Sequence, residues 1–289
     1  MAKTTGIAWT RSSWNPWIGC TEVSPGCDNC YARALDALHK WGGATHWGPG
    51  VPRHRTSFHY WKQPMIWNRA AEHERITGKV LTQSTWKGRP GFWPVFPSLC
   101  DPFDNEVPEE WRADFWRLIR ATPTLTYLLL TKRIGNVIKM LPTHPFPMWH
   151  DGWHNVWIGA SIVNPDELRR DLPKLRAIPA ARRFVSYEPA IEAVDWTGQL
   201  DGIHQVIVGG ESNQGGKKAR PFDTKWARST VRQCKEAGVA VFVKQIGSNP
   251  VSLNTSPHDN KLYSVAIKDR AGADPAEWPE DLRVQEFPT

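Results

Sequence analysis

The feature that most limits the fold of this 289-residue chain is a succession of seven short apolar segments, rich in β-branched and aromatic residues. We interpret these segments as buried strands at 14–20, 92–101, 125–133, 155–162, 182–190, 204–212 and 239–247. Strands that are apolar nearly throughout and alternate with helices predict a parallel sheet covered on both faces. The succession therefore favours an α/β fold, a partial or closed parallel βα barrel of the TIM type, over the alternative of an open Rossmann-type sheet.

Helix-like sequence follows most of these segments, as at 30–41 and at 108–121, where Pro108 and two acids suit a helix N-terminus. Residues 42–90 interrupt the alternation as a long insertion after the first βα unit, and long insertions of this kind are functional or disordered. We predict a barrel domain at 1–247 and a C-terminal extension of loop and surface helix at 248–289.

Polar side chains gather where the predicted strands end. They are Ser98, Asp101, Thr131, Lys132, Arg133, Ser161, Ser186, Glu188, Glu211, Ser212, Lys244 and Gln245. In a βα barrel the carboxyl ends of the strands meet at one mouth, which carries the active site. The cysteine-rich stretch GCTEVSPGCDNCYA also follows a strand end, so the same mouth is expected to hold it.

The chain shows neither the apolar run of a signal peptide in MAKTTGIAWTRSSWNPW nor a stretch of eighteen apolar residues. We expect a cytoplasmic protein without a membrane partner, in a reducing compartment where clustered cysteines bind metal or do chemistry. The net charge of +7 suits a polyanionic partner. Most of the seventeen tryptophans are expected in the core; the stretch 53–69, where aromatic and basic residues alternate, could instead stack on unpaired bases.

Cys20, Cys27 and Cys30 have the spacing C-x6-C-x2-C, and Pro25 and Gly26 supply a turn between them. Three thiolates from one short loop can hold three irons of a 4Fe-4S cluster and leave the fourth iron open. An open iron is what S-adenosylmethionine (SAM) requires as a ligand in radical chemistry. The sequence thus predicts a 4Fe-4S cluster and SAM as cofactors.

Other uses of the cysteines stay open. A zinc site would need a fourth ligand from elsewhere, such as Cys100, His39 or His46. Three ordinary buried cysteines would suit the polar, turn-rich flanks less well. Cys100 and Cys234 are expected in the core.

The run WNPWIGCTEVSPGCDNCYA, together with FPSLCDPFDNEVPEEWR, LLTKR, NVWIGASI, FVSYEP, VIVGGES and FVKQIG, resembles an uncharacterised family common in bacteriophages and bacterial mobile elements. That family is described by its three-cysteine motif and is distantly similar to the radical SAM superfamily and to spore photoproduct lyase. The resemblance covers most of residues 5–247 and implies that Cys20, Cys27 and Cys30 ligate the cluster within a partial barrel. The spacing departs from the common radical SAM loop, which has three residues between its first two cysteines and an aromatic residue where Asn29 stands here.

In the superfamily a Gly-Gly-Glu motif after the second strand often receives the SAM amino group. Here Gly209, Gly210 and Glu211 follow the sixth strand, so this role is not transferred to them. By position, Ser98 and Asp101 are the candidates for the SAM amino group, and Ser161 is expected near the ribose.

The remaining strand-end residues are the candidates for catalysis. Lys132, Arg133 and Lys244 could neutralise a carboxylate or phosphate, and Glu188 and Glu211 could accept hydrogen bonds from a base or an amine. The alternative is that Lys132 pairs with one of the two glutamates as a structural ion pair.

The leading hypothesis is an enzyme that cleaves SAM reductively, using a separate electron donor, and acts on a nucleic-acid or nucleotide-related substrate in DNA repair or modification. A companion protein is a partner that the sequence leaves open. The alternatives are a non-enzymatic nucleic-acid-binding protein with a structural zinc site in the cysteine loop, and a cluster protein that uses SAM as a regulatory ligand or methyl donor. Charge and aromatic content carry the nucleic-acid part of each hypothesis.

Overall fold

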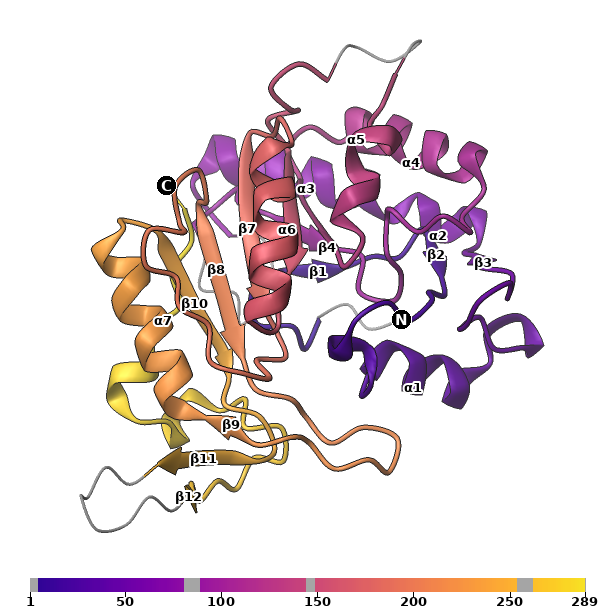
Figure 1. Ribbon diagram of the computed structural model, residues 1–289. Coiled ribbons are helices and arrows are strands. Elements are labelled where there is room, and N and C mark those ends of the chain that lie inside the picture. Colours follow the sequence, from indigo (N-terminus) through magenta and orange to yellow (C-terminus); the bar gives the residue numbers. More distant parts are fainter. Residues whose placement is uncertain (1–4, 81–88, 144–148, 254–261, 289) are drawn as a thin grey trace. The chain divides into compact units, whose positions relative to one another are not determined.

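The computed structural model describes residues 5–80, 89–143, 149–253 and 262–288 (Figure 1). Seven strands form one parallel sheet in the order β1-β4-β5-β6-β7-β8-β10. They are β1 (Ser12–Ser13), β4 (Pro94–Phe96), β5 (Thr126–Thr131), β6 (Val156–Ser161), β7 (Arg182–Tyr187), β8 (Gln205–Gly209) and β10 (Ala240–Gln245). Within the described ranges β1 and β10 are not paired with each other, so the fold is a partial α/β barrel and not a closed one.

Seven helices accompany these strands in the described part of the chain. They are α1 (Tyr31–His39), α2 (Phe58–Trp61), α3 (Gln63–Thr77), α4 (Glu109–Ala121), α5 (Val137–Met140), α6 (Pro165–Ala177) and α7 (Thr224–Glu236). Helix α4 begins as predicted, after Pro108 and with two glutamates in its first turn, where the free backbone N–H groups favour negative charge. No helix among the described residues combines the length and apolar character that crossing a membrane requires.

The chain divides into two compact units. The first comprises Met1–Glu22, Leu35–Ile158 and Ile178–Arg182, and the second comprises Val23–Ala34, Gly159–Ala177 and Arg183–Thr289. The division runs through α1, β6 and β7, each of which has residues in both units.

In the first unit the sheet begins earlier than predicted. The predicted strand 14–20 is wrong in its position, because the sheet strand is Ser12–Ser13, which pairs with Val95 and Phe96 of β4. Pro16 has no backbone N–H and cannot continue such a ladder. Beyond it, β2 (Trp17–Ile18) turns into an antiparallel pair with β3 (His54–Arg55), so the insertion 42–90 contributes a strand as well as α2 and α3.

Large aromatic side chains fill the core, as the sequence predicted for most tryptophans. The buried ones are Trp9, Trp14, Trp17, Trp93, Trp116, Trp149, Trp157, Trp196 and Trp278. In the first unit Trp14 packs against Phe115 of α4 with ring centroids 6.0 Å apart, which ties the start of the chain to that helix. Side chains from 53–69 contribute here too, since Trp61 meets Trp14 edge-on at 5.3 Å.

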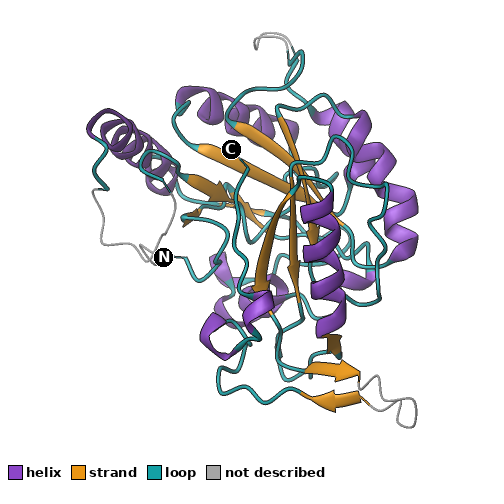
Figure 2. Ribbon diagram, turned by 90° about the vertical axis from the view of Figure 1, so that its left-hand side faces the viewer, coloured by secondary structure: helices purple, strands orange, loops and turns teal. Residues whose placement is uncertain are grey.

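In the second unit α7 packs on β8 and β10 (Figure 1). The C-terminal segment differs from the predicted loop and surface helix. A strand, β11 (Pro250–Leu253), pairs with β9 (Phe222–Asp223) and with β12 (Leu262–Ser264) in a small three-stranded sheet (Figure 2).

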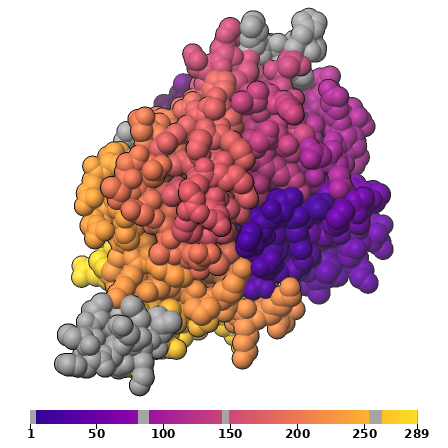
Figure 3. Space-filling view, in the orientation of Figure 1, coloured from indigo at the N-terminus to yellow at the C-terminus, as the bar shows by residue number. Residues whose placement is uncertain are grey.

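The last described residues of the second unit run along β10. The backbone N–H of Val243 donates to Val284 O at 2.8 Å, and that of Glu286 donates to Val241 O at 3.0 Å. In the space-filling view the yellow C-terminal residues lie against the orange segment that carries α7 (Figure 3). The chain thereby covers an edge strand that would otherwise offer free N–H and C=O groups to other chains.

Candidate functional site: the cysteine loop and the strand ends

Cys20 lies in the first unit, two residues after β2, and its nearest charged partner is Arg133. Arg133 follows β5 and donates from Nη1 to Cys20 Sγ at 3.3 Å and from Nη2 to Thr21 O at 2.5 Å. In the ligand-free structure burial raises the pKa of the Cys20 thiol to about 12, with Asp101 and Asp104 adding to the shift and Arg133 opposing it. A guanidinium beside a cysteine sulfur stabilises the thiolate form of that cysteine, which is the form that binds metals.

Asp101 holds Arg133 in place. Its Oδ2 accepts from Arg133 Nη1 at 3.1 Å, from Thr131 Oγ1 at 2.9 Å and from the Lys132 backbone N–H at 3.3 Å, and its Oδ1 accepts from the Phe103 backbone N–H at 2.9 Å. A carboxylate has about four acceptor positions, so little capacity remains for another donor. The structure therefore places Asp101 as the positioning residue of Arg133, and its predicted contact with the SAM amino group stays a prediction.

A second buried ion pair, which the sequence analysis did not identify, supports Thr21 from the other side. Arg53 donates from Nε to Asp104 Oδ2 at 2.8 Å and from Nη2 to Thr21 Oγ1 at 2.7 Å. Gly19 makes this approach possible, because a Cβ there would lie 2.8 Å from Arg53 Cδ. No short motif marks Arg53 and Asp104 as partners, since they are far apart in the sequence.

Cys27 and Cys30 lie in the second unit, on a turn whose backbone is closed by hydrogen bonds from Cys27 N to Ser24 O at 2.8 Å and from Cys30 N to Cys27 O at 3.1 Å. Cys27 is buried and ends a 3-10 turn, Pro25–Cys27, while Cys30 is half-buried and directly precedes α1. Ser24 Oγ caps the turn by accepting from Gly26 N and donates to Glu167 Oε1 at 2.7 Å. Loop geometry thus comes from Ser24, Pro25 and Gly26, as the turn residues predicted.

Glu211, a predicted catalytic residue, anchors this turn. Its carboxylate accepts from Asn29 Nδ2 at 2.8 Å and from Arg220 Nη2 at 2.5 Å. Burial would raise the pKa of Glu211, but the hydrogen bonds from Arg220 and Asn29 outweigh it and lower that pKa. Arg220 Nη1 continues to Pro25 O and to Asp28 Oδ2, both at 3.1 Å. Arg220 was not foreseen from the sequence, where it stands in a plain basic stretch.

Glu188 and Lys244 form the other ion pair at the strand ends of the second unit. Lys244 Nζ lies 2.8 Å from Glu188 Oε1, and the two side chains are 22% and 12% exposed. The predicted structural pairing of Lys132 with Glu188 or Glu211 is therefore wrong, because Glu188 pairs with Lys244 and Glu211 with Arg220. Next to Lys244, Gln245 Nε2 donates to Gly210 O and to Ser212 Oγ, each at 2.8 Å.

The two predicted cofactor serines lie in separate units. Ser98 Oγ shares a hydrogen bond with Ser13 Oγ at 2.6 Å in the first unit, and Ser161 Oγ donates to Glu188 O at 3.4 Å in the second. Lys132 follows β5 in the first unit, next to Arg133. The roles predicted for these three side chains stay predictions.

The candidate fourth zinc ligands differ in their availability. Both ring nitrogens of His46 face backbone carbonyls, Nδ1 that of Pro52 at 3.0 Å and Nε2 that of Trp41 at 2.6 Å. Since a carbonyl oxygen lies within hydrogen-bond distance of each ring nitrogen, neither nitrogen faces an open position for a metal, and His46 is unsuited as a ligand. The backbone of Cys100 pairs with that of Gly19 in an isolated parallel β-bridge, and burial raises the pKa of the Cys100 thiol.

The donor chemistry of the cysteines fits an iron–sulfur cluster: Cys20, Cys27 and Cys30 are all free thiols on one loop. Arg133 holds the start of that loop in the first unit, and Arg220 with Glu211 holds its end in the second. Across the described residues no group of three or more His, Cys, Asp or Glu side chains is already arranged around a single metal position.

Comparison with known proteins gives one match. Neither the curated proteins nor the solved structures contain a significant match to the chain. A family model does match, over residues 4–272, which is nearly the whole chain. The chain therefore belongs to the family described as "Protein of unknown function (DUF5131)".

Proposed function

We propose that the chain is an iron–sulfur enzyme of the radical SAM kind, built on a TIM-like partial barrel, in which Cys20, Cys27 and Cys30 hold a 4Fe-4S cluster. The observation that carries the proposal is the cysteine loop itself, which presents three free thiols; Arg133 contacts its start in the first unit, and Arg220 contacts its later part in the second unit. Within each unit, such contacts hold the backbone that carries the cysteines, which favours metal ligation.

The chain's own residues would divide the work. Arg133 offsets negative charge at Cys20. Arg220 holds Asp28 directly and holds Asn29 through Glu211. Reductive cleavage of SAM, with one electron from a separate donor, would supply the hydrogen-abstracting chemistry of this class. Glu188 and Lys244 are the strand-end pair that we propose to contact the substrate, since both are partly exposed and carry opposite charges.

We propose a nucleic acid or a nucleotide-related compound as the substrate. The net charge of +7 supports a polyanionic substrate. Lys132, a cation that follows β5, would offer a partner to a phosphate group.

The first test is the iron, sulfide and zinc content of protein purified without oxygen, with its visible absorption. We expect close to four irons and four sulfides per chain. Cys27→Ala should abolish cluster loading while the chain stays folded, as judged by circular dichroism. The control is Cys234→Ala, which removes a buried cysteine of α7 outside the loop and should leave the iron content unchanged.

Two results would overturn the proposal. Unchanged iron in Cys27→Ala would remove the ligand assignment. Stoichiometric zinc without iron would favour a binding protein with a structural metal site. If iron loads as expected, production of deoxyadenosine from SAM and a reductant separates the radical enzyme from a protein that uses SAM as a regulatory ligand or methyl donor.

A further inference from the structure

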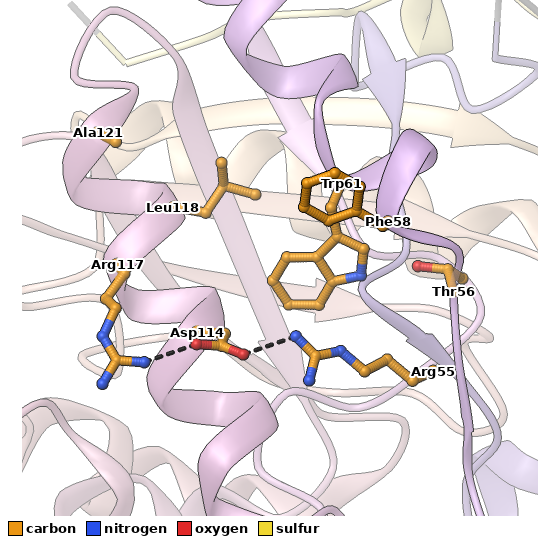
Figure 4. A pocket seen from close by; sticks show the side chains of 8 residues that line it. All are labelled: Arg55, Thr56, Phe58, Trp61, Asp114, Arg117, Leu118 and Ala121. Carbon is orange, nitrogen blue, oxygen red and sulfur yellow. Dashed lines mark hydrogen bonds and ion pairs between the residues drawn. The ribbon is translucent and has the colours of Figure 1, made fainter.

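A hollow of about 650 Å³ opens on the surface of the first unit between α2 and α4 (Figure 4). Its volume falls within the range of small-molecule sites, roughly 300–1,000 Å³. Trp61 and Phe58 from α2 form one wall, and Leu118 and Ala121 from α4 lie opposite them. The residues of α2 belong to the stretch 53–69, in which aromatic and basic residues alternate.

Aromatic rings are unusually accessible at this hollow. Phe58 is 79% exposed, although large apolar side chains are costly to leave in water. The ammonium of Lys62 lies 4.6 Å from the Phe58 ring centroid. An accessible aromatic face beside a cation is the kind of surface on which single-stranded nucleic acids stack their bases.

Cations outnumber acids around the hollow. Arg55 and Arg117 both donate to the one carboxylate of Asp114, at 2.6 Å each, as the dashed lines in Figure 4 show. Their side chains are 36% and 59% exposed, and the Arg55 guanidinium also lies 4.7 Å from the Trp61 ring centroid. With Lys62 beside Phe58, three cationic side chains lie along the aromatic wall.

We propose that this hollow binds single-stranded nucleic acid, with an unpaired base stacked on Phe58 and Trp61 and the adjoining phosphates on Arg55 and Arg117. Charge complementarity selects this occupant, because an apolar protein segment would bury the guanidinium groups without supplying anions. A paired base stays within its duplex and cannot reach a concave aromatic wall. The site requires no metal and is therefore independent of the proposed cluster.

The test is fluorescence anisotropy with a labelled 20-mer of single-stranded DNA, its RNA equivalent, and the corresponding duplex, titrated with the full chain at several salt concentrations. We expect both single strands to bind more tightly than duplex. Phe58→Ala should weaken binding about 5- to 140-fold, the range that loss of one stacked base implies. Arg117→Gln should lower the slope of log K against log salt by about 0.7, which corresponds to one phosphate contact.

Matched controls come from the same unit. Ile76→Ala truncates an exposed apolar side chain of α3, 73% exposed, and Arg75→Gln removes an exposed cation that pairs with Glu72. Both should bind as the unaltered chain does. The proposal is overturned if no single strand binds, if duplex binds equally well, or if Phe58→Ala and Arg117→Gln behave like the controls. The first of these outcomes would point to a protein partner for this face. Iron content, measured without oligonucleotide, tests the cluster separately.

Discussion

At the scale of single residues, the strand ends of the second unit hold a close ion pair. Glu188 and Lys244 form a close pair, and Gly209 provides the space for it, because a Cβ at this position would lie 2.9 Å from Glu188 Oε1. Both side chains are largely removed from water, so removal of one leaves the other charge without a partner. Their pairing has a stability consequence as well as the substrate role proposed for it.

A double-mutant cycle measures the Glu188–Lys244 pair. Glu188→Gln and Lys244→Met should each lower the free energy of unfolding by about 1–3 kcal/mol, because each leaves an uncompensated polar partner. The double variant should lose less than the sum, by about 1 kcal/mol, as measured by urea denaturation. Additivity within about 0.3 kcal/mol would show that the pair adds nothing to stability.

At the scale of elements, close packing between neighbouring strands sets which residues are tolerated. Gly159 in β6 faces the ring of Phe184 in β7, and a Cβ added at Gly159 would collide with that ring. Phe184 is fully buried and has no free space into which it could turn. The glycine therefore determines how closely these two strands approach.

Gly159→Ala should lower the free energy of unfolding by about 1–3 kcal/mol, because an overpacked core forces shifts of side chain or backbone. Thermal denaturation followed by circular dichroism checks this. Gly135→Ala is the control, since a Cβ there meets nothing within 4 Å and alanine suits a helical turn better than glycine. Equal stability of the two variants would contradict the packing argument.

Arg220, from elsewhere in the second unit, makes several of the hydrogen bonds that hold the turn carrying Cys27 and Cys30. Arg220 contacts Glu211, Pro25 O and Asp28, so its charge is shared among three anchors. Hydrogen bonds to charged groups are worth about 1.5–3 kcal/mol each. Loss of Arg220 should therefore loosen the turn locally without unfolding the sheet.

Arg220→Met should accelerate alkylation of Cys27 about tenfold or more, because Cys27 is buried and reacts only when the turn opens. The rate is measured by mass spectrometry on metal-free, reduced protein. Arg228→Met is the matched control, since it removes an equal charge from α7, where Arg228 pairs with Asp281 at an exposed position. Equal rates in both variants would show that Arg220 does not secure the turn.

At the scale of the whole molecule, the C-terminal segment is part of the second unit. Val284 and Glu286 continue the hydrogen bonding of the sheet beyond β10, and the Phe287 ring meets Phe242 of β10 with centroids 5.4 Å apart. Trp278 and Leu282, which come shortly before these residues in the sequence, are buried. Stability of the sheet edge thus depends on residues far along the chain.

Deletion of residues 284–289 should lower the free energy of unfolding by about 2–4 kcal/mol, from two lost backbone hydrogen bonds and the lost burial of Phe287. It should also raise the tendency to aggregate, because the edge of β10 becomes open for pairing. Urea denaturation and light scattering measure the two effects. A chain shortened only by Thr289 is the control. An unchanged denaturation midpoint in the longer deletion would contradict this account.

The sequence by itself determined the periodic part of the structure. The runs 155–162 and 204–212 are apolar at their centres and rich in β-branched residues, which is typical of a strand buried on both faces, and β6 and β8 lie where we predicted. Pro108 with its following acids located α4, and the spacing of Cys20, Cys27 and Cys30 placed them on one loop. These are local properties of the chain, which short stretches of sequence contain in full.

Tertiary structure alone decided which side chains far apart in the sequence contact each other. Three contacts depend on which segments become neighbours in the fold: Arg133 with Cys20, Arg220 with the cysteine turn, and Glu188 with Lys244. Tertiary structure also decided three features of the backbone: the open sheet, the pairing of Trp17–Ile18 with β3, and the strand in the C-terminal segment. Contacts between distant residues form only once the chain has closed long loops, and a single sequence contains no local signal for which loops close.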